Sequence, residues 1–336
     1  GNTWQSIVGA SALLWIVHFL ILRGVQTAAS INLVATLAKL LPLGLFVVLA
    51  MMMFKLDTFK LDFTGLALGV PVWEQVKNTM LITLWVFIGV EGAVVVSARA
   101  RNKRDVGKAT LLAVLSALGV YLLVTLLSLG VVARPELAEI RNPSMAGLMV
   151  EMMGPWGEII IAAGLIVSVC GAYLSWTIMA AEVPFLAATH KAFPRIFARQ
   201  NAQAAPSASL WLTNICVQIC LVLIWLTGSD YNTLLTIASE MILVPYFLVG
   251  AFLLKIATRP LHKAVGVGAC IYGLWLLYAS GPMHLLLSVV LYAPGLLVFL
   301  YARKTHTHDN VLNRQEMVLI GMLLIASVPA TWMLVG

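Results

Sequence analysis

Long apolar runs, separated by short polar and basic segments, make up most of the chain. A helix needs about 20 apolar residues to cross the hydrocarbon core of a bilayer. No run shows the extended alternation of a barrel strand, and within lipid a helix satisfies its own backbone polar groups. The pattern therefore predicts an all-α polytopic membrane protein with ten transmembrane helices: 4–22, 27–53, 79–97, 109–133, 156–186, 208–227, 232–254, 264–279, 283–302 and 316–335.

Composition excludes an ordinary soluble domain, because 61% of the residues are hydrophobic and only 10% are charged. The net charge of +7 follows membrane topology and does not indicate a nucleic-acid partner. When the connections between spans are taken alternately, fifteen of the 21 Lys and Arg residues fall in one set and five in the other, with Lys39 inside a span. Cytoplasmic loops are rich in Lys and Arg. We therefore expect the larger set to face the cytoplasm: Arg23, Arg99, Arg101, Lys103, Arg104, Lys108, Lys191, Arg195, Arg199, Lys255, Arg259, Lys263, Arg303, Lys304 and Arg314.

The chain carries no signature of an enzyme. It has no glycine loop that would cradle phosphate, no nucleotide motif and no nucleophile–base arrangement. We therefore expect no catalytic residue, no metal and no cofactor, and we expect any transport to be coupled to an ion or counter-substrate gradient. The four cysteines fall inside predicted spans and lack metal-ligand spacing: Cys170, Cys216, Cys220 and Cys270.

The third predicted span contains the most informative segment, 83–93, with Trp85, Gly89, Glu91 and Gly92. A carboxylate in hydrocarbon costs about 2.5–3.5 kcal/mol on insertion scales. Glycines weaken a helix, and in transporters they mark helices that unwind at a binding site. We favour a substrate site at mid-depth in the membrane. The alternative is a packing seam, in which the glycines admit a neighbouring helix and Glu91 bonds to a backbone group.

Few other polar residues lie inside the spans. Lys39 precedes Pro42, which removes a helix hydrogen bond, so we expect a structural or ion-like role for this lysine. Glu240 lies near the middle of the seventh span and should face the bundle interior or a water path, for function or for packing. Trp176 and Tyr246 join Trp85 as aromatic candidates for a cavity wall, since they lie away from the interfacial belt.

Several segments together resemble the amino acid–polyamine–organocation superfamily. Residues 84–91 and the basic loop 99–108 are similar to its sixth helix and the following loop. Residues 174–177, 193–201 and 243–246 strengthen the likeness, and they resemble the basic amino acid/polyamine antiporter branch. Within that branch the whole chain is most similar to the bacterial arginine/ornithine antiporters.

The resemblance implies a fold of two five-helix repeats of inverted topology, LeuT-like, with extra carboxy-terminal helices. It places the start of this chain at the family's fourth helix. Residues 1–53 would then be the remnant of the first repeat, 79–254 the second repeat and 264–336 the carboxy-terminal helices, in a single transporter domain. An outward-facing start of the first span agrees with a carboxy-terminal portion of a longer transporter. Such a portion alone is expected to be inactive or poorly folded.

The resemblance also implies roles for individual residues. The tryptophan matching Trp85 stacks on the substrate side chain, and the one matching Trp176 forms a middle gate near the guanidinium. The acid matching Glu91 and the tyrosine matching Tyr246 contribute to the opposite gate, with Glu91 implicated in the pH response. Backbone groups freed around Ile88–Gly92 bind the polar end of the substrate.

One departure from the family concerns the seventh span. Ala238 stands where arginine-importing members carry a serine that contacts substrate, and Ser239 and Glu240 follow it. We therefore include Ser239 and Glu240 among the candidate site residues, while the exact substrate stays open.

The resemblance implies an antiporter of the bacterial inner membrane that exchanges arginine for ornithine by alternating access. Its partners would be these cationic amino acids, membrane lipids and a second copy of the chain, since family members are commonly dimers. Two alternatives remain. The first is lysine/cadaverine or ornithine/putrescine exchange. The second is a non-transporting membrane subunit or sensor built on a degenerate antiporter scaffold.

Overall fold

The computed structural model describes residues 3–95, 97, 100, 102–141, 143–228, 231–306 and 312–335. Within these ranges some side chains lie outside the description, chiefly those of 25–32, 231–237, 282–288 and of Glu240. Everything described is helix or connection, and no strand occurs in these ranges.

The helices follow the apolar pattern. They are α1 (Trp4–Leu22), α2 (Val25–Met53), α3 (Leu56–Lys60), η1 (Leu66–Leu68), α4 (Val72–Phe87), α5 (Gly92–Val95), α6 (Lys103–Val131), α7 (Arg134–Glu139), α8 (Ser144–Met153), α9 (Pro155–Thr189), η3 (Arg195–Ala198), α10 (Ser207–Thr227), α11 (Tyr231–Ile256), α12 (Pro260–Ser280), α13 (Pro282–His306) and α14 (Arg314–Val335).

Each of the ten predicted ranges coincides with a helix, and the third is divided between α4 and α5. Among the described residues, six helical segments are long and apolar enough to cross a bilayer. The all-helical membrane architecture is therefore confirmed, while the count of ten spans and the inverted repeat stay predictions. The six segments are Trp4–Leu22, Leu33–Met53, Asp105–Val131, Pro155–Thr189, Ser207–Thr227 and Pro260–Ser280.

Local sequence explains where several helices begin and end. The Thr3 side chain accepts a hydrogen bond from the backbone N–H of Ser6 and caps α1. Proline stands in the first turn of α9 and of α12, where its missing N–H costs nothing. Gly228 ends α10 in the left-handed conformation, with φ +69°.

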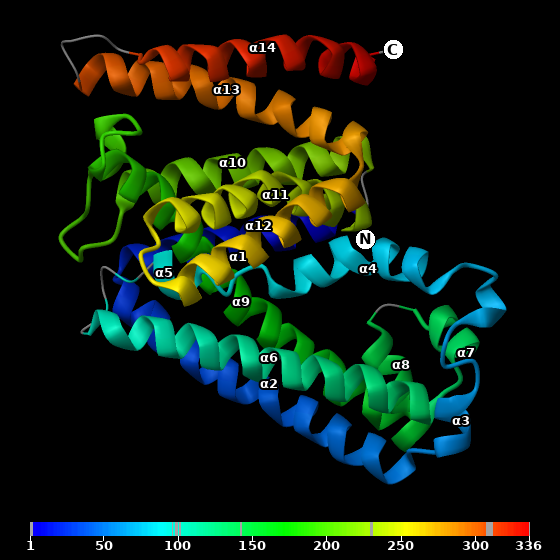
Figure 1. Ribbon diagram of the computed structural model, residues 1–336. Helices are drawn as coiled ribbons and strands as arrows, with labels where there is room; N and C mark the ends of the chain where they lie inside the picture. Colours follow the sequence, from blue (N-terminus) through cyan, green and yellow to red (C-terminus); the bar gives the residue numbers. More distant parts are fainter. Residues whose placement is uncertain are drawn as a thin grey trace.

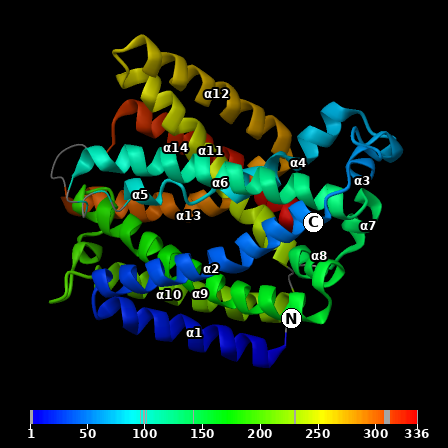
Figure 2. The ribbon, with the colours of Figure 1, turned by 90° about the horizontal axis from the view of Figure 1, so that it is seen from below.

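The helices form a bundle in which segments far apart in sequence lie side by side (Figures 1 and 2). One group joins α1, α9 and α10, and α9 also packs against α2 and α8. A second group joins α11 and α12 with α4. The broken segment between α4 and α5 therefore lies where α11 and α9 both approach it.

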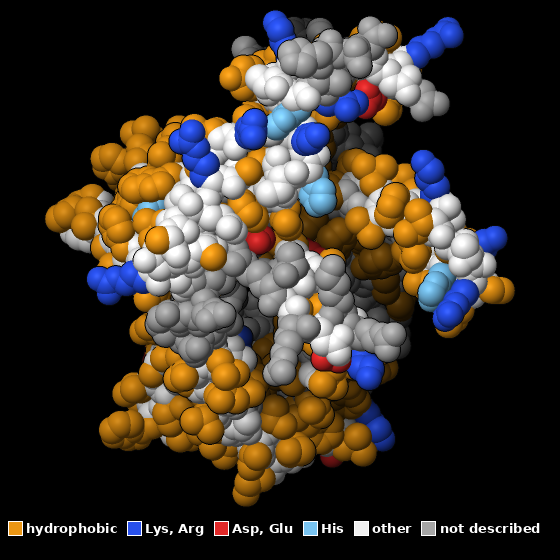
Figure 3. Space-filling model, turned by 90° about the vertical axis from the view of Figure 1, so that its left-hand side faces the viewer, with side chains coloured by type: hydrophobic (Ala, Val, Ile, Leu, Met, Phe, Trp, Pro, Cys, Tyr) orange, Lys and Arg blue, Asp and Glu red, His pale blue; other side chains and the backbone are white. Residues whose placement is uncertain are grey.

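Connections between the long helices alternate between two ends of the bundle (Figure 1). Those after α1, α9 and α11 lie at the left-hand end, and those after α2 and α12 lie at the right-hand end. Lys and Arg side chains stand out across the left-hand face when it is turned toward the viewer (Figure 3). The alternation of basic residues in the sequence is thus an alternation in space.

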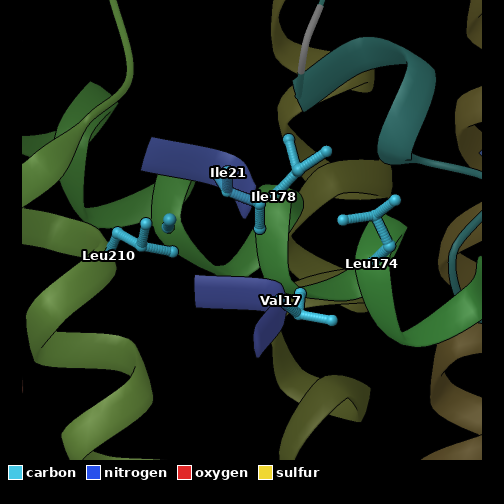
Figure 4. Packing of buried hydrophobic residues seen from close by; sticks show 6 residues of the cluster. Val17, Ile21, Leu174, Ile178 and Leu210 are labelled. Atoms are coloured by element: carbon cyan, nitrogen blue, oxygen red, sulfur yellow. The ribbon is translucent and has the colours of Figure 1, made fainter. Parts of the chain in front are cut away.

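A hydrophobic core fixes the first group of helices. Val17 and Ile21 of α1 pack against Leu174 and Ile178 of α9 and against Leu210 of α10 (Figure 4). Each of these side chains is at most 8% exposed, so this three-helix junction excludes solvent and lipid. The junction anchors α9, which carries Trp176.

Candidate functional site

The centre of the candidate site is a break in the third predicted span. Helix α4 ends at Phe87 and α5 begins at Gly92, so residues 88–91 are not helical. Gly89 adopts φ +109°, a conformation that residues with a side chain rarely adopt. Because the helix is interrupted here, turn-type bonds replace helical ones: the N–H of Val90 donates to the carbonyl of Phe87 at 3.4 Å and that of Gly92 to the carbonyl of Gly89 at 3.0 Å. Some carbonyls that a continuous helix would pair are released.

Tyr121 of α6 forms a hydrogen bond with one of these released carbonyls. Its hydroxyl donates to the backbone carbonyl of Val86 at 3.2 Å, and its ring lies edge-on to Phe87 with centroids 5.6 Å apart. The sequence did not single out Tyr121. Its only signal was a polar aromatic residue in the middle of the apolar run 109–133.

The carboxylate of Glu91 forms a hydrogen bond with the backbone of the break itself. Its Oε2 atom accepts a hydrogen bond from the backbone N–H of Gly89 at 2.9 Å and another from the hydroxyl of Tyr246 at 3.1 Å. Hydrogen bonds to an ionised group are among the stronger ones in proteins, so they offset part of the cost of placing this acid within a span. The bond to Gly89 is the backbone contact expected from the packing alternative, whereas the bond to Tyr246 links the break to α11.

Helix α9 packs against both glycines of the segment. A Cβ atom at Gly89 would lie 3.0 Å from Cζ2 of Trp176, and one at Gly92 would lie 2.5 Å from Sδ of Met179. Trp176 and Met179 are three residues apart, so they share a face of α9. Met179 was not predicted, although its spacing from Trp176 was the available signal. Both glycines thus admit the close approach of a neighbouring helix.

Apolar packing holds α4 against α11 and α12. Leu84, Leu243 and Leu276 are at most 4% exposed, and Ile88 and Tyr246 pack against them. The backbone at Ile88 is extended, with φ −60° and ψ 131°, so this side chain anchors the first residue of the break. The cluster fixes Tyr246 beside Glu91.

The structure thus brings five of the predicted residues together: Ile88, Gly89, Glu91, Trp176 and Tyr246.

The remaining predicted residues lie around this group. Trp85 is half-buried in the last turn of α4, four residues before Gly89. Ser239 lies seven residues before Tyr246 on α11 and is fully buried, and its Oγ has no hydrogen-bond partner in the described part of the chain. The side chain of Glu240 lies outside the described residues.

Two further predictions concern ionisable groups and metals. Lys39 does not join the site, because it lines a separate cavity of about 340 Å³ between α2 and α9, together with Pro42, Gly164 and Ser168. Among the described residues, no group of three or more His, Cys, Asp or Glu could hold a metal ion. The chemistry of the central site therefore comes from one carboxylate, aromatic rings and a stretch of non-helical backbone.

Comparison with known proteins gives a family match over nearly the whole chain. A model of the amino acid permease family matches residues 1–324. The arginine/ornithine antiporter of Pseudomonas aeruginosa is 44% identical over 323 residues, which is 90% of this chain and 67% of the relative. The arginine/agmatine antiporter of Chlamydia caviae is 41% identical over 328 residues, covering 92% of this chain and 67% of the relative. A putative amino-acid transporter of Clostridium perfringens is 38% identical over 346 residues, covering 97% and 72%.

Proposed function

The chain belongs to the amino acid permease family, and from this premise we propose that the intact protein exchanges external arginine for internal ornithine across the bacterial inner membrane. It is a multi-pass membrane transporter and not an enzyme. The chain spans about two thirds of the relatives it matches, so the proposal concerns the intact protein.

One observation carries the proposal: a hydrogen-bonded carboxylate and a tryptophan ring meet at a non-helical break within a membrane span. Glu91 is a counter-charge for a cationic side chain, and its two hydrogen-bond donors hold the same oxygen, Oε2. Trp176 packs on the break at Gly89 and is 42% exposed, so part of its ring is free to receive a ligand. An aromatic face attracts a guanidinium or ammonium by about 0.5–2 kcal/mol.

The other end of the substrate would use the backbone. An amino acid also carries an α-carboxylate and an α-ammonium. The only charged side chain among Ile88, Gly89, Glu91, Trp176 and Tyr246 is Glu91, so these five side chains do not provide partners for both groups. Residues 88–91 lie outside regular helix, and the N–H groups of Ile88, Gly89 and Val90 donate to carbonyls of α4 or to Glu91, so a substrate would replace one of these bonds. Broken helices in transporters bind substrate through such groups.

Alternating access would move one helix group against the other. The α1–α9–α10 group carries Trp176, and the α4–α11–α12 group carries Trp85, Ile88 and Tyr246. The bond between Tyr246 and Glu91 would then act as a closing contact on one side of the substrate if the α5 side of the break, which packs against α9, moves with α9. We further propose that 79–254 forms the second inverted repeat and that 1–53 belongs to the first.

A second substrate pair is favoured by the relatives named arginine/agmatine antiporters. Arginine and ornithine each carry one positive charge, so their exchange is electroneutral. Exchange against an amine with one more positive charge moves net charge across the membrane. The same distinction separates lysine/cadaverine and ornithine/putrescine exchange from our proposal.

The test is uptake of labelled arginine into liposomes that contain the intact protein and are loaded with ornithine, with agmatine or with buffer. We expect uptake only with internal ornithine, and a rate that does not change when a potassium diffusion potential is imposed. Uptake driven by agmatine and sensitive to the potential would establish the second pair. Absence of exchange with every internal cation would favour a non-transporting subunit. The same assay on residues 1–336 shows whether this portion suffices.

A further inference from the structure

Two connections, after α9 and before α12, lie at the left-hand end of the bundle (Figure 1) and carry a similar arrangement of side chains. In the connection after α9, the apolar side chain of Ile196 is 51% exposed and stands between the exposed Arg195 and Arg199. At the start of α12, Leu261 is 71% exposed and stands between the exposed Arg259 and Lys263. Each connection therefore shows one apolar side chain flanked by two cations.

The first of these connections is held rigidly. The Asn201 side chain donates to the carbonyl of Leu22 at the end of α1 at 2.7 Å, and its Oδ1 accepts from the backbone N–H of Ala205 at 2.9 Å. The hydroxyl of Ser209 donates to the carbonyl of Phe197 at 2.9 Å. A connection fixed at both flanks presents Arg195 and Arg199 in defined positions.

The cations of the second connection, like those of the first, have no acidic residue near them in sequence. This connection consists of the three residues 257–259 and the first turn of α12, where Pro260 fixes the helix start. No Asp or Glu occurs in 190–206 or in 255–263. Within the described residues, no ion pair joins Arg195, Arg199, Arg259 or Lys263 to any carboxylate. These four cations are therefore available to an external anion.

We propose that these two pads, 195–199 and 259–263, bind the headgroups of anionic glycerophospholipids at one face of the membrane. The cations would contact the lipid phosphate, and Ile196 and Leu261 would enter the boundary between headgroups and acyl chains. Basic residues with an apolar neighbour are the pattern by which proteins hold to an anionic membrane surface. Arg suits this role because its planar guanidinium matches phosphate geometry.

The cationic pads require an anionic ligand. Their position at the ends of membrane helices indicates that this ligand is a phospholipid headgroup. Both pads adjoin the ends of membrane helices, α9 and α12, so they lie where phospholipid headgroups are concentrated. The opposite end of the bundle offers a matched control, because Lys55 and Lys60 are also exposed. There Lys55 and Lys60 stand on either side of the exposed Leu56 in the same way, but Asp57 lies between them and offsets part of their charge.

The experiment measures bound lipid and needs no transport, so it can fail or succeed independently of the proposed exchange. The purified protein is supplied with equal phosphatidylglycerol and phosphatidylcholine, and the retained lipids are quantified by native mass spectrometry. We expect preferential retention of phosphatidylglycerol. Retention should fall to about half in Arg195→Gln/Arg199→Gln and in Arg259→Gln/Lys263→Gln, where one pad remains. It should fall at least about fivefold when all four changes are combined, since one basic residue at an anionic surface contributes a factor of about five.

Two further variants complete the test. Lys55→Gln/Lys60→Gln removes the same charge at the other end and should leave retention unchanged. Ile196→Ser leaves the charge intact and, combined with Arg259→Gln/Lys263→Gln so that only the first pad remains, should lower retention about twofold or more relative to that background, because it removes the apolar contact. Equal retention in wild type and both pad variants, or an equal loss in the Lys55/Lys60 control, would overturn the proposal. Unchanged retention on adding Ile196→Ser to that background would overturn the part assigned to the apolar side chain.

Discussion

The hydroxyl of Tyr246 donates a hydrogen bond of 3.1 Å to Oε2 of Glu91, although the two residues are 155 positions apart in the chain. The same oxygen accepts from the backbone N–H of Gly89 at 2.9 Å. One carboxylate oxygen therefore joins the break between α4 and α5 to helix α11. A change at either end of this contact should alter how the break closes on a substrate.

Tyr246→Phe should slow arginine exchange about tenfold and leave folding intact. The phenyl ring keeps its packing beside Leu84, Leu243 and Leu276, while Glu91 loses one of its two donors. A hydrogen bond to a charged group contributes about 1.5–3 kcal/mol. Initial rates of exchange in liposomes measure the effect. Tyr272→Phe on α12 is the control, and an equal effect there would show that Tyr246 has no special role.

Glu91→Gln should lower exchange strongly and flatten its dependence on pH. The glutamine amide oxygen still accepts from Gly89, so the local geometry of the break is retained, but the counter-charge for a cationic substrate is lost. Exchange rates and the apparent KM for arginine across a series of pH values test this. A pH profile identical to that of wild type would remove Glu91 from the mechanism.

Trp85→Ala should abolish exchange without disturbing membrane insertion. Trp85 lies in the last turn of α4, directly before the break, and is only half-buried, so its removal opens no core cavity. Loss of an aromatic face for a guanidinium costs about 0.5–2 kcal/mol in binding, and more where water is excluded. Uptake assays and the amount of protein in the membrane separate the two effects. Trp85→Phe should recover part of the activity, and normal transport by Trp85→Ala would show that the site is misplaced.

The helical scaffold was predictable because runs of about 20 apolar residues have few other stable forms in lipid. The residues at which the helices begin and end were less predictable. Helix α4 begins at Val72, seven residues before the predicted start at 79, because polar residues such as Glu74 and Lys77 interrupt the apolar pattern while the helix continues. The short helices α3, α7 and α8 were missed, since none is long enough to register as a span.

The break at 88–91 could be anticipated from Gly89, Glu91 and Gly92, because each is unfavourable in a continuous apolar helix. The partners of these residues could not be derived from the pattern. Contacts from Tyr246 and Met179 depend on how α11 and α9 cross α4 and α5, and side-chain spacing within one helix carries no information about the crossing partner. For Tyr246 the family resemblance supplied the association.

Gly89→Ala should destabilise the protein by about 1–3 kcal/mol and stop exchange, because φ +109° is strained for alanine. The added Cβ would also lie 3.0 Å from Cζ2 of Trp176, closer than ordinary contact. The midpoint of thermal unfolding in detergent measures the loss. Gly119→Ala is the control, because nothing lies within 4 Å of a Cβ there and the residue is within α6. Combining Gly89→Ala with Trp176→Phe should recover only the steric part of the loss.

The pair His18 and Asn214 gives the last prediction, which concerns the scaffold. Their side chains are fully buried between α1 and α10, and His18 Nδ1 lies 2.8 Å from Asn214 Nδ2. Asn214→Ala removes the one partner that His18 has in the described part of the chain, so it should cost about 1–3 kcal/mol. The double variant His18→Leu/Asn214→Leu should be more stable than Asn214→Ala, because no buried polar atom is left unpaired. Thermal unfolding in detergent compares the two. Since the pair lies away from Glu91 and Tyr246, the apparent KM for arginine should stay at its wild-type value in both variants, and a raised KM would show that this helix pair contributes to the site.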